Sequence, residues 1–131
     1  SKATNVDATV KAISGLHDPY ILIAGGYDKK VHFNEMLEAF KKGGRLLILI
    51  GETKYQIAKE AEDMGLSEKV IIKEDLRSAL NTAQNMAEDG DIVLLSPASA
   101  SWDQYPNFEA RGDEFRNLVN SIAEVNNGRR T

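Results

Sequence analysis

The stretch Asp91-Ile-Val-Leu-Leu95, continued by Ser96-Pro-Ala-Ser-Ala-Ser-Trp102, decides the fold of this chain. Its apolar run is continuous, which is typical of a strand buried on both faces of a sheet. Small hydroxyl residues follow the run, then an aromatic loop and a predicted helix that begins near Gly112. In an open parallel sheet, ligands bind in the loops that leave the carboxyl ends of strands. The stretch therefore predicts both a buried strand and a binding loop.

Strand and helix patterns alternate along the rest of the chain. Further continuous apolar runs occupy residues 20–24, 45–50 and 69–72, and stripes of helical period occupy residues 6–13, 33–40, 57–64, 76–87 and 115–122. Gly43-Gly44 and Gly65 are predicted to stop two of the helices, and Asp75 is predicted to cap another. Alternation of this kind predicts right-handed crossovers. We expect an α/β fold: a Rossmann-like, doubly wound, mainly parallel sheet with helices on both faces.

Length and composition limit the class of protein. A chain of 131 residues fits one domain, expected over residues 1–125 with a frayed tail at 126–131. With no cysteine, disulfides and thiolate zinc sites are excluded. No apolar run approaches the roughly 18 residues of a membrane span, and the net charge of −4 argues against nucleic-acid binding. A recognisable motif at the first residues indicates a domain excised from a longer chain.

Several residues admit both a structural and a functional interpretation. Gly25-Gly26 is either a tight turn or a place where a ligand approaches the backbone, and it completes neither a dinucleotide fingerprint nor a phosphate-binding loop. Lys29 and Lys30 are either solvated or hold a carboxylate or phosphate. Thr4-Asn5 is either a helix N-cap or an anion site, and the two interpretations are compatible.

A serine nucleophile is not predicted. The serines at 96, 99 and 101 lack a Gly-x-Ser-x-Gly elbow, and the only histidines are His17 and His32. Both histidines are expected at the surface, and neither forms a metal motif with acidic neighbours.

Three segments in order carry a family resemblance: Ser1-Lys-Ala-Thr-Asn5, Ala24-Gly-Gly-Tyr-Asp-Lys-Lys-Val-His-Phe33 and Ser96-Pro-Ala-Ser-Ala-Ser-Trp-Asp103. Over residues 1–119 the chain resembles the C-terminal domain of the Mur ligases, and in particular of the members that add D-glutamate. The diaminopimelate-adding members carry an Asp-Asn-Pro-Arg motif, which is absent here.

The resemblance implies a set of substrate-binding residues. Lys29 is expected to bind a D-glutamate carboxylate, with Lys30 as the alternative register, and Thr4 to contact D-glutamate as well. Ser101 and the backbone of Phe108 are expected to hold the side-chain carboxylate, with Trp102 beside them. Lys2 is expected in both the substrate and the nucleotide regions, and Asn5 in the nucleotide region.

The resemblance also implies an activity. The parent enzyme is expected to be a monomeric, cytoplasmic, ATP-dependent ligase that joins D-glutamate to UDP-N-acetylmuramoyl-L-alanine in peptidoglycan synthesis. ATP and Mg²⁺ are expected to bind mainly to a central domain that this chain lacks, so the chain alone is not expected to catalyse. Two alternatives remain: a domain of another Mur-type amino-acid ligase, or a stand-alone module that binds a small ligand.

Overall fold

The computed structural model describes residues 5–25, 32–88, 90–95 and 108–111. In chain order its elements are α1 (Asn5–Ser14), β1 (Tyr20–Gly25), α2 (Asn34–Gly43), β2 (Gly44–Ile50), α3 (Lys54–Asp63), the short 3₁₀ helix η1 (Ser67–Lys69), β3 (Val70–Ile72), α4 (Leu76–Met86), β4 (Ile92–Leu95) and β5 (Phe108–Arg111). The described elements confirm the predicted alternation of helices and strands.

The strands form one sheet in the order β3-β2-β1-β4-β5. The first four run parallel, and β5 pairs antiparallel with β4. Because β2 lies on one side of β1 and β4 on the other, the strand order reverses at β1. The result is the predicted doubly wound α/β fold, with its topological switch point between β1 and β4.

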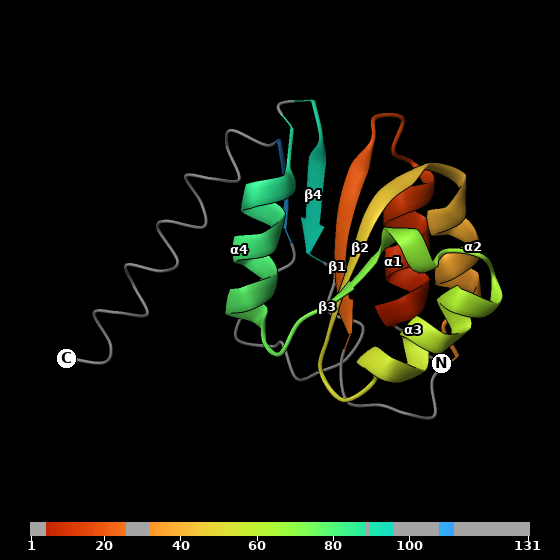
Figure 1. The fold of residues 1–131 in the computed structure, drawn as a ribbon. Helices are drawn as coiled ribbons and strands as arrows, with labels where there is room; N and C mark the ends of the chain where they lie inside the picture. The colour runs from red at the N-terminus through yellow and green to blue at the C-terminus, as the bar shows by residue number, and fades with distance from the viewer. Residues whose placement is uncertain (1–4, 26–31, 89, 96–107, 112–131) are drawn as a thin grey trace.

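Helices cover both faces of the sheet (Figure 1). The first three, α1 to α3, lie on one face, and α4 lies on the other. Among the described segments, none of the helices has the length and hydropathy of a membrane span. Successive strand residues contribute alternately to the two faces, so each of the central strands reads as a continuous apolar run.

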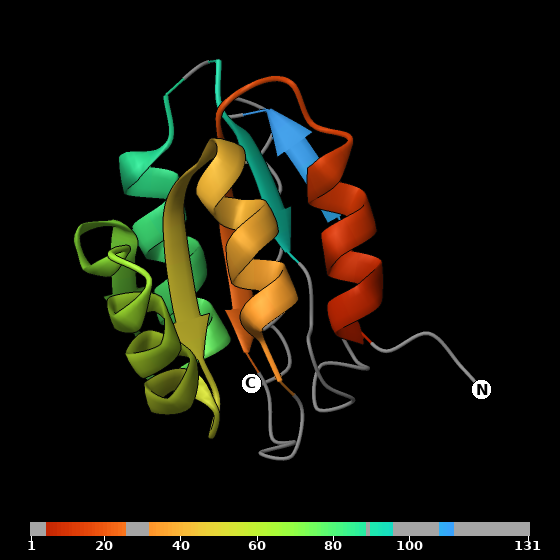
Figure 2. The same ribbon diagram turned by 90° about the vertical axis from the view of Figure 1, so that its right-hand side faces the viewer.

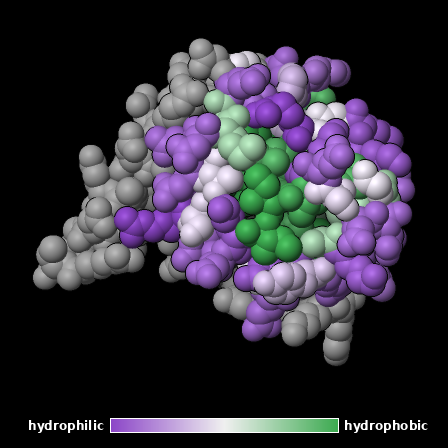
Figure 3. Space-filling model, viewed as in Figure 1, coloured by the Kyte–Doolittle hydropathy of each residue, from purple (hydrophilic) through white to green (hydrophobic). Residues whose placement is uncertain are grey.

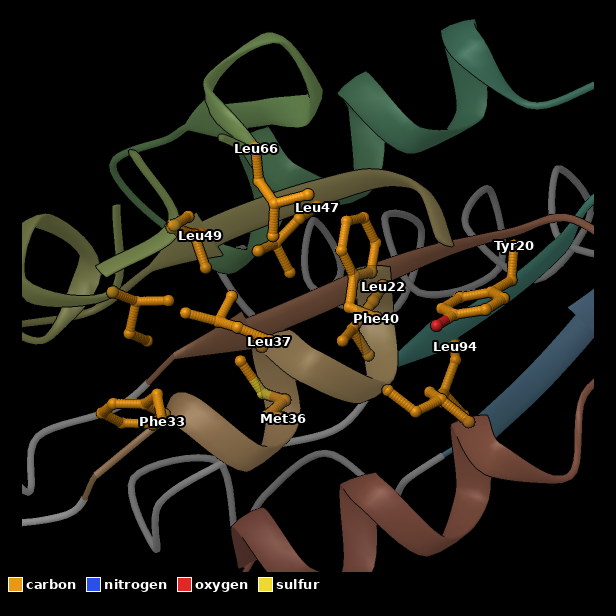
Figure 4. Close-up of a cluster of buried hydrophobic side chains, with 14 of the residues drawn as sticks. Tyr20, Leu22, Phe33, Met36, Leu37, Phe40, Leu47, Leu49, Leu66 and Leu94 are labelled. Atoms are coloured by element: carbon orange, nitrogen blue, oxygen red, sulfur yellow. The ribbon is translucent and has the colours of Figure 1, made fainter. Parts of the chain in front are cut away.

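The core beneath α1, α2 and α3 is the larger of two apolar clusters (Figure 4). Helix α2 packs Met36, Leu37 and Phe40 against the sheet, and all three side chains are fully buried. Their spacing of one, three and four residues forms the single apolar stripe that the sequence predicts. The ring of Phe40 meets that of Tyr20 edge to face, with centroids 5.8 Å apart.

Two strands differ from the prediction. The sequence treats residues 96–111 as a loop, whereas Phe108–Arg111 forms β5, which is held by pairing with β4 rather than by any local signal. The run at 69–72 was expected to be buried on both faces, but β3 is an edge strand and Ile72 is 36% exposed. The apolar surface at the centre of Figure 3 lies where Figure 1 draws β3.

The glycines that end helices act in two different ways. Gly65 has a φ of 78°, and the N–H groups of Gly65 and Leu66 close the end of α3 on the carbonyls of Glu62 and Ala61. Gly44 instead has an extended backbone with φ −73°. The predicted stop at Gly43-Gly44 is confirmed, because α2 ends at Gly43, and glycine is needed at position 44 because a Cβ there would lie 2.1 Å from the Phe40 ring.

Candidate functional site

The carboxyl ends of β1 and β4 lie side by side. Their parallel register pairs Ile23 with Leu95, the last described residue before the serine-rich segment. Gly25, which begins the Gly-Gly pair, lies two residues beyond Ile23. The prediction that these strands are neighbours is confirmed, and the two loops predicted to bind the ligand therefore leave adjacent strands at one edge.

Strand β5 begins at the same edge. It runs antiparallel to β4 and pairs Phe108 with Leu95. The segment between these residues thus begins and ends at one point of the sheet. The predicted binding loop is therefore flanked by two residues that are neighbours on the sheet.

The four described α-helices all begin at this carboxyl edge. Helix α1 precedes β1 and runs antiparallel to it, so the first turn of α1 lies at the end of the sheet where the β1 and β2 arrowheads end (Figure 2). Helices α2, α3 and α4 each follow a parallel strand, and their first turns lie at that edge too. Helix N-termini carry partial positive charge and free N–H groups, so this end of the domain favours anionic ligands.

Glycine is needed at position 25 for a structural reason. Its φ is 142°, and a Cβ at this position would lie 1.8 Å from the carbonyl oxygen of Ile50 on β2. The glycine is therefore required by the close approach of two strand ends, whatever binds nearby. The packing against Ile50 therefore explains the first glycine of the pair without any need for room for a ligand.

Most of the predicted site residues lie outside the described residues. Lys2, Thr4, Lys29, Ser101 and Trp102 fall in segments 1–4, 26–31 and 96–107, as does the alternative Lys30. Asn5 is the first residue of α1, and Phe108 is the first residue of β5. The roles assigned to all of these residues remain predictions.

Chain connectivity limits how far the undescribed residues lie from described ones. A chain spans at most about 3.6 Å per residue, so Lys29 lies within about 14 Å of Gly25 and Ser101 within about 22 Å of Leu95. Thr4 directly precedes Asn5. These limits are compatible with one pocket at the carboxyl edge.

The loop after β2 adds residues that the sequence analysis did not single out. Gly51 turns the chain with a φ of 82°, and Thr53 then lies fully buried before α3 begins. Lys54 places its ammonium 5.5 Å from the ring centroid of Tyr55, which is 67% exposed. A glycine directly after an apolar run was the available signal for a turn at this edge.

The shifted pKa of Asp75 has a local structural cause. Asp75 accepts a hydrogen bond of 2.8 Å from the backbone N–H of Ser78, which lowers the pKa of its carboxyl group and confirms the predicted cap of α4. His17 and His32 are exposed, as expected. Within the described ranges, no three histidine, aspartate or glutamate side chains gather as a metal site requires.

An ion pair lies at the amino end of the sheet, opposite the carboxyl ends of the parallel strands. Asp91 is buried just before β4, where its carboxylate pairs with Arg45 of β2 and accepts the Nε–H of that residue at 2.9 Å. The backbone N–H of Glu88 donates to the same carboxylate oxygen at 2.9 Å. This cluster ties the amino ends of two strands together and is remote from the ligand edge.

Comparison with known proteins gives a consistent result. Residues 1–99 match the family described as Mur ligase, glutamate ligase domain. The chain is 47% identical over 122 residues to the UDP-N-acetylmuramoylalanine--D-glutamate ligase of Clostridioides difficile, covering 93% of this chain and 27% of the relative. Enzymes of the same name from Caldanaerobacter subterraneus and Ligilactobacillus salivarius are 48% and 43% identical over 91% and 95% of the chain. The chain spans 27% of the length of each of these relatives.

Proposed function

Because the chain belongs to the Mur ligase glutamate ligase domain family, we propose that it is the D-glutamate-binding domain of a peptidoglycan ligase. The enzyme joins D-glutamate to UDP-N-acetylmuramoyl-L-alanine in the cytoplasm with hydrolysis of ATP. The three relatives described above are each named as D-glutamate ligases, which supports the proposal. The observation that carries it is the adjacency of the β1 and β4 carboxyl ends, which brings the two loops of the predicted pocket to one edge.

D-glutamate has two carboxylates, so its pocket needs two separate sets of donors. Lys29 and Thr4 bind the carboxylate on the α-carbon, through a charge-assisted hydrogen bond and a hydroxyl donor. Ser101 and the backbone N–H of Phe108 bind the side-chain carboxylate, and Trp102 forms a wall beside them. The register of Phe108 with Leu95 supports this arrangement because it returns the second donor set to the same edge.

The nucleotide lies toward the start of α1. Lys2 and Asn5 contact it from the N-terminal side, where the helix start favours a phosphate. Following the resemblance to the Mur ligases, we assign the Mg²⁺ ligands and most ATP contacts to the rest of the enzyme.

The domain contributes to catalysis by orientation. Two carboxylates held at separate points fix the direction of the D-glutamate amine, which attacks the substrate carboxyl group once ATP has activated it. Holding the amine in line converts an encounter between two solutes into a reaction within one complex. Closure over the remainder of the enzyme excludes water, which otherwise competes with the amine.

The proposal is tested by substituting two neighbouring lysines in a full-length D-glutamate ligase that carries this segment. Lys29→Ala removes a charge-assisted hydrogen bond worth about 1.5–3 kcal/mol and lowers kcat/KM for D-glutamate by roughly tenfold or more. Lys30→Ala is the matched control and changes kcat/KM less than about twofold. If only Lys30→Ala is damaging, the register is shifted by one residue; if neither is, the proposed pocket is wrong.

The 131-residue chain by itself is expected to bind without catalysis. It should unfold cooperatively on heating and release no phosphate in the presence of ATP, Mg²⁺, D-glutamate and UDP-N-acetylmuramoyl-L-alanine. Phosphate release by clean protein would contradict the assignment of the ATP site to other parts of the enzyme.

A further inference from the structure

The exposed apolar side chains are divided unequally between the two ends of the sheet. In the described part of the chain, the large apolar residues that are exposed are Tyr55, Ile72 and Met86, at 67%, 36% and 41%. Met86 lies at the amino end, where its carbonyl accepts a hydrogen bond of 2.7 Å from Arg45. Tyr55 and Ile72 lie at the carboxyl end, near the proposed ligand edge. A single exposed apolar residue is ordinary, whereas two at the ligand end point to a contact surface.

Ile72 is the last residue of the outer strand β3. It pairs with Leu49, and the N–H of Lys73 donates to the carbonyl of Leu49 at 2.9 Å. Backbone groups of alternate residues face a parallel neighbour, so the N–H and the carbonyl of Ile72 point away from β2. No described strand pairs with this outer edge of β3. The apolar surface at the centre of Figure 3 is thus an open sheet edge, with an apolar side chain and a backbone donor and acceptor turned outward.

Tyr55 lies in the first turn of α3. The helix packs against β3, and Figure 1 shows its first turn and the end of β3 at the same end of the domain. The ammonium of Lys54 lies 5.5 Å from the centroid of the Tyr55 ring. The first turn of α3 contains no acidic residue, and no described acidic side chain forms an ion pair with Lys54. The start of α3 therefore presents an aromatic ring and a positive charge close to the apolar edge of β3.

These groups flank the proposed ligand edge. Strands β1, β2 and β3 are successive neighbours about 4.8 Å apart, so Ile72 lies about 10 Å from the carboxyl end of β1. The chain spans 27% of the length of its relatives, and the proposed function assigns ATP and the UDP-linked substrate to the remainder. The D-glutamate amine reaches the activated carboxyl group only when the ligand edge faces that remainder. Side chains that flank the edge then face the remainder as well.

We propose that Lys54, Tyr55 and Ile72 form a docking surface for the rest of the ligase when the domain closes over its substrates. The inference rests on the proposed function. The receiving surface is apolar and offers a carboxylate to Lys54, which lacks a counter-ion on its own side. Tyrosine is enriched at interfaces, and the contact with Lys54 reduces the freedom that the ring loses on docking. Two apolar side chains are too few for a permanent interface, so docking is reversible, as a catalytic cycle requires.

The test compares the two ends of the sheet in the full-length ligase. Tyr55→Ser and Ile72→Ser each remove an apolar side chain of the docking surface, and Met86→Ser is the matched control at the amino end. Small-angle X-ray scattering follows the radius of gyration while an ATP analogue, Mg²⁺ and both substrates are added to saturation. The parent enzyme and Met86→Ser should become more compact. Tyr55→Ser should stay extended and lose about tenfold in kcat/KM for D-glutamate, whereas Met86→Ser should change it less than about twofold.

A charge reversal tests the chemistry of the receiving surface. Lys54→Glu should prevent compaction as Tyr55→Ser does, whereas Lys59→Glu, at an exposed position further along α3, should not. Equal effects of the two reversals would refute the carboxylate partner. Because Tyr55 is mostly exposed, Tyr55→Ser should leave the melting temperature almost unchanged, so it decides the test even if Ile72→Ser does not fold.

The remaining outcomes separate docking from the ligand pocket. Normal compaction and normal kcat/KM in Tyr55→Ser would overturn the docking surface, whatever Lys29→Ala shows. A mass of two chains by light scattering, reduced to one chain by Tyr55→Ser, would assign the surface to a second copy and overturn the proposal as well. If Tyr55→Ser prevents compaction but Lys29→Ala leaves kcat/KM unchanged, the docking surface stands and the D-glutamate pocket fails.

Discussion

At the amino end of the sheet the strands begin beneath aromatic and charged side chains, whereas at the carboxyl end β1 and the loop after β2 carry glycines with positive φ. Tyr20 and Phe40 pack against each other at the first end, where Arg45 pairs with Asp91. Gly25 and Gly51 mark the second. The aromatic pair and the ion pair therefore lie opposite the proposed ligand edge, and substitutions at the two ends should have separable effects.

Gly25→Ala is expected to have the largest effect on stability. It is an exception to the separation of the two ends, because Gly25 lies at the carboxyl end of β1 but is needed for the fold. The new Cβ would meet the Ile50 carbonyl at 1.8 Å in a backbone conformation that L-residues rarely adopt. We expect a loss of about 3 kcal/mol or more in the free energy of unfolding, measured by urea denaturation.

The matched control for this change is Gly90→Ala. A Cβ there meets no atom within 4 Å, so the free energy of unfolding should change by less than about 0.5 kcal/mol. Equal losses in the two variants would show that the close approach of β1 to Ile50 is not what demands glycine.

Asp91→Ala tests whether a change at the amino end of the sheet affects stability without affecting D-glutamate binding. It leaves the Arg45 guanidinium and the Glu88 N–H without their shared acceptor beside the sheet. Losing these charge-assisted hydrogen bonds costs about 1.5–3 kcal/mol, which thermal unfolding would detect. In the full-length ligase the KM for D-glutamate should remain unchanged once the protein is folded. A large rise in that KM would mean that the two ends are coupled.

Among the substitutions expected to change the stability, Tyr20→Phe should have the smallest effect, and the effect should have the opposite sign. The Tyr20 hydroxyl is buried without a hydrogen-bond partner among the described residues, and burial raises the pKa of this phenol to about 12. Removing an unsatisfied buried hydroxyl should stabilise the protein by about 1 kcal/mol at neutral pH.

The pH dependence of Tyr20→Phe follows from the same shift. The unfolded phenol ionises near pH 10 and the folded one near 12, so the Tyr20 protein loses stability between these values as pH rises. The Phe variant should lack this loss. Denaturation curves at pH 7, 10 and 11 test both statements, and a variant less stable than the parent at pH 7 would indicate a partner for the hydroxyl.

The sequence patterns predicted the features that depend on residues close together in the chain. Continuous apolar runs identified the four parallel strands, and local rules identified the Asp75 cap and the Gly65 stop. Strand β5 escaped prediction because its pairing joins Phe108 to a residue thirteen positions earlier in the chain. The Arg45–Asp91 pair and the Phe40–Gly44 contact escaped it because each requires knowing how elements pack.

For the candidate site, too, some features could be predicted from the sequence pattern and others could not. Its edge was inferred from strand order and crossover handedness, and the structure confirms that β1 and β4 are neighbours. The individual ligand contacts come from family resemblance. Composition and spacing alone do not separate a ligand-binding Lys29 from a solvated one, because both sit equally well in a loop after a strand.

The central claim is that D-glutamate binds at the carboxyl edge between β1 and β4. Amide resonances of the ¹⁵N-labelled chain, followed while D-glutamate is added, test it most directly. We predict saturable shifts at Gly25, Leu95 and Phe108, none at Arg45 or Asp91, and smaller shifts with L-glutamate. Shifts confined to the amino end, or equal responses to the two enantiomers, would contradict the account.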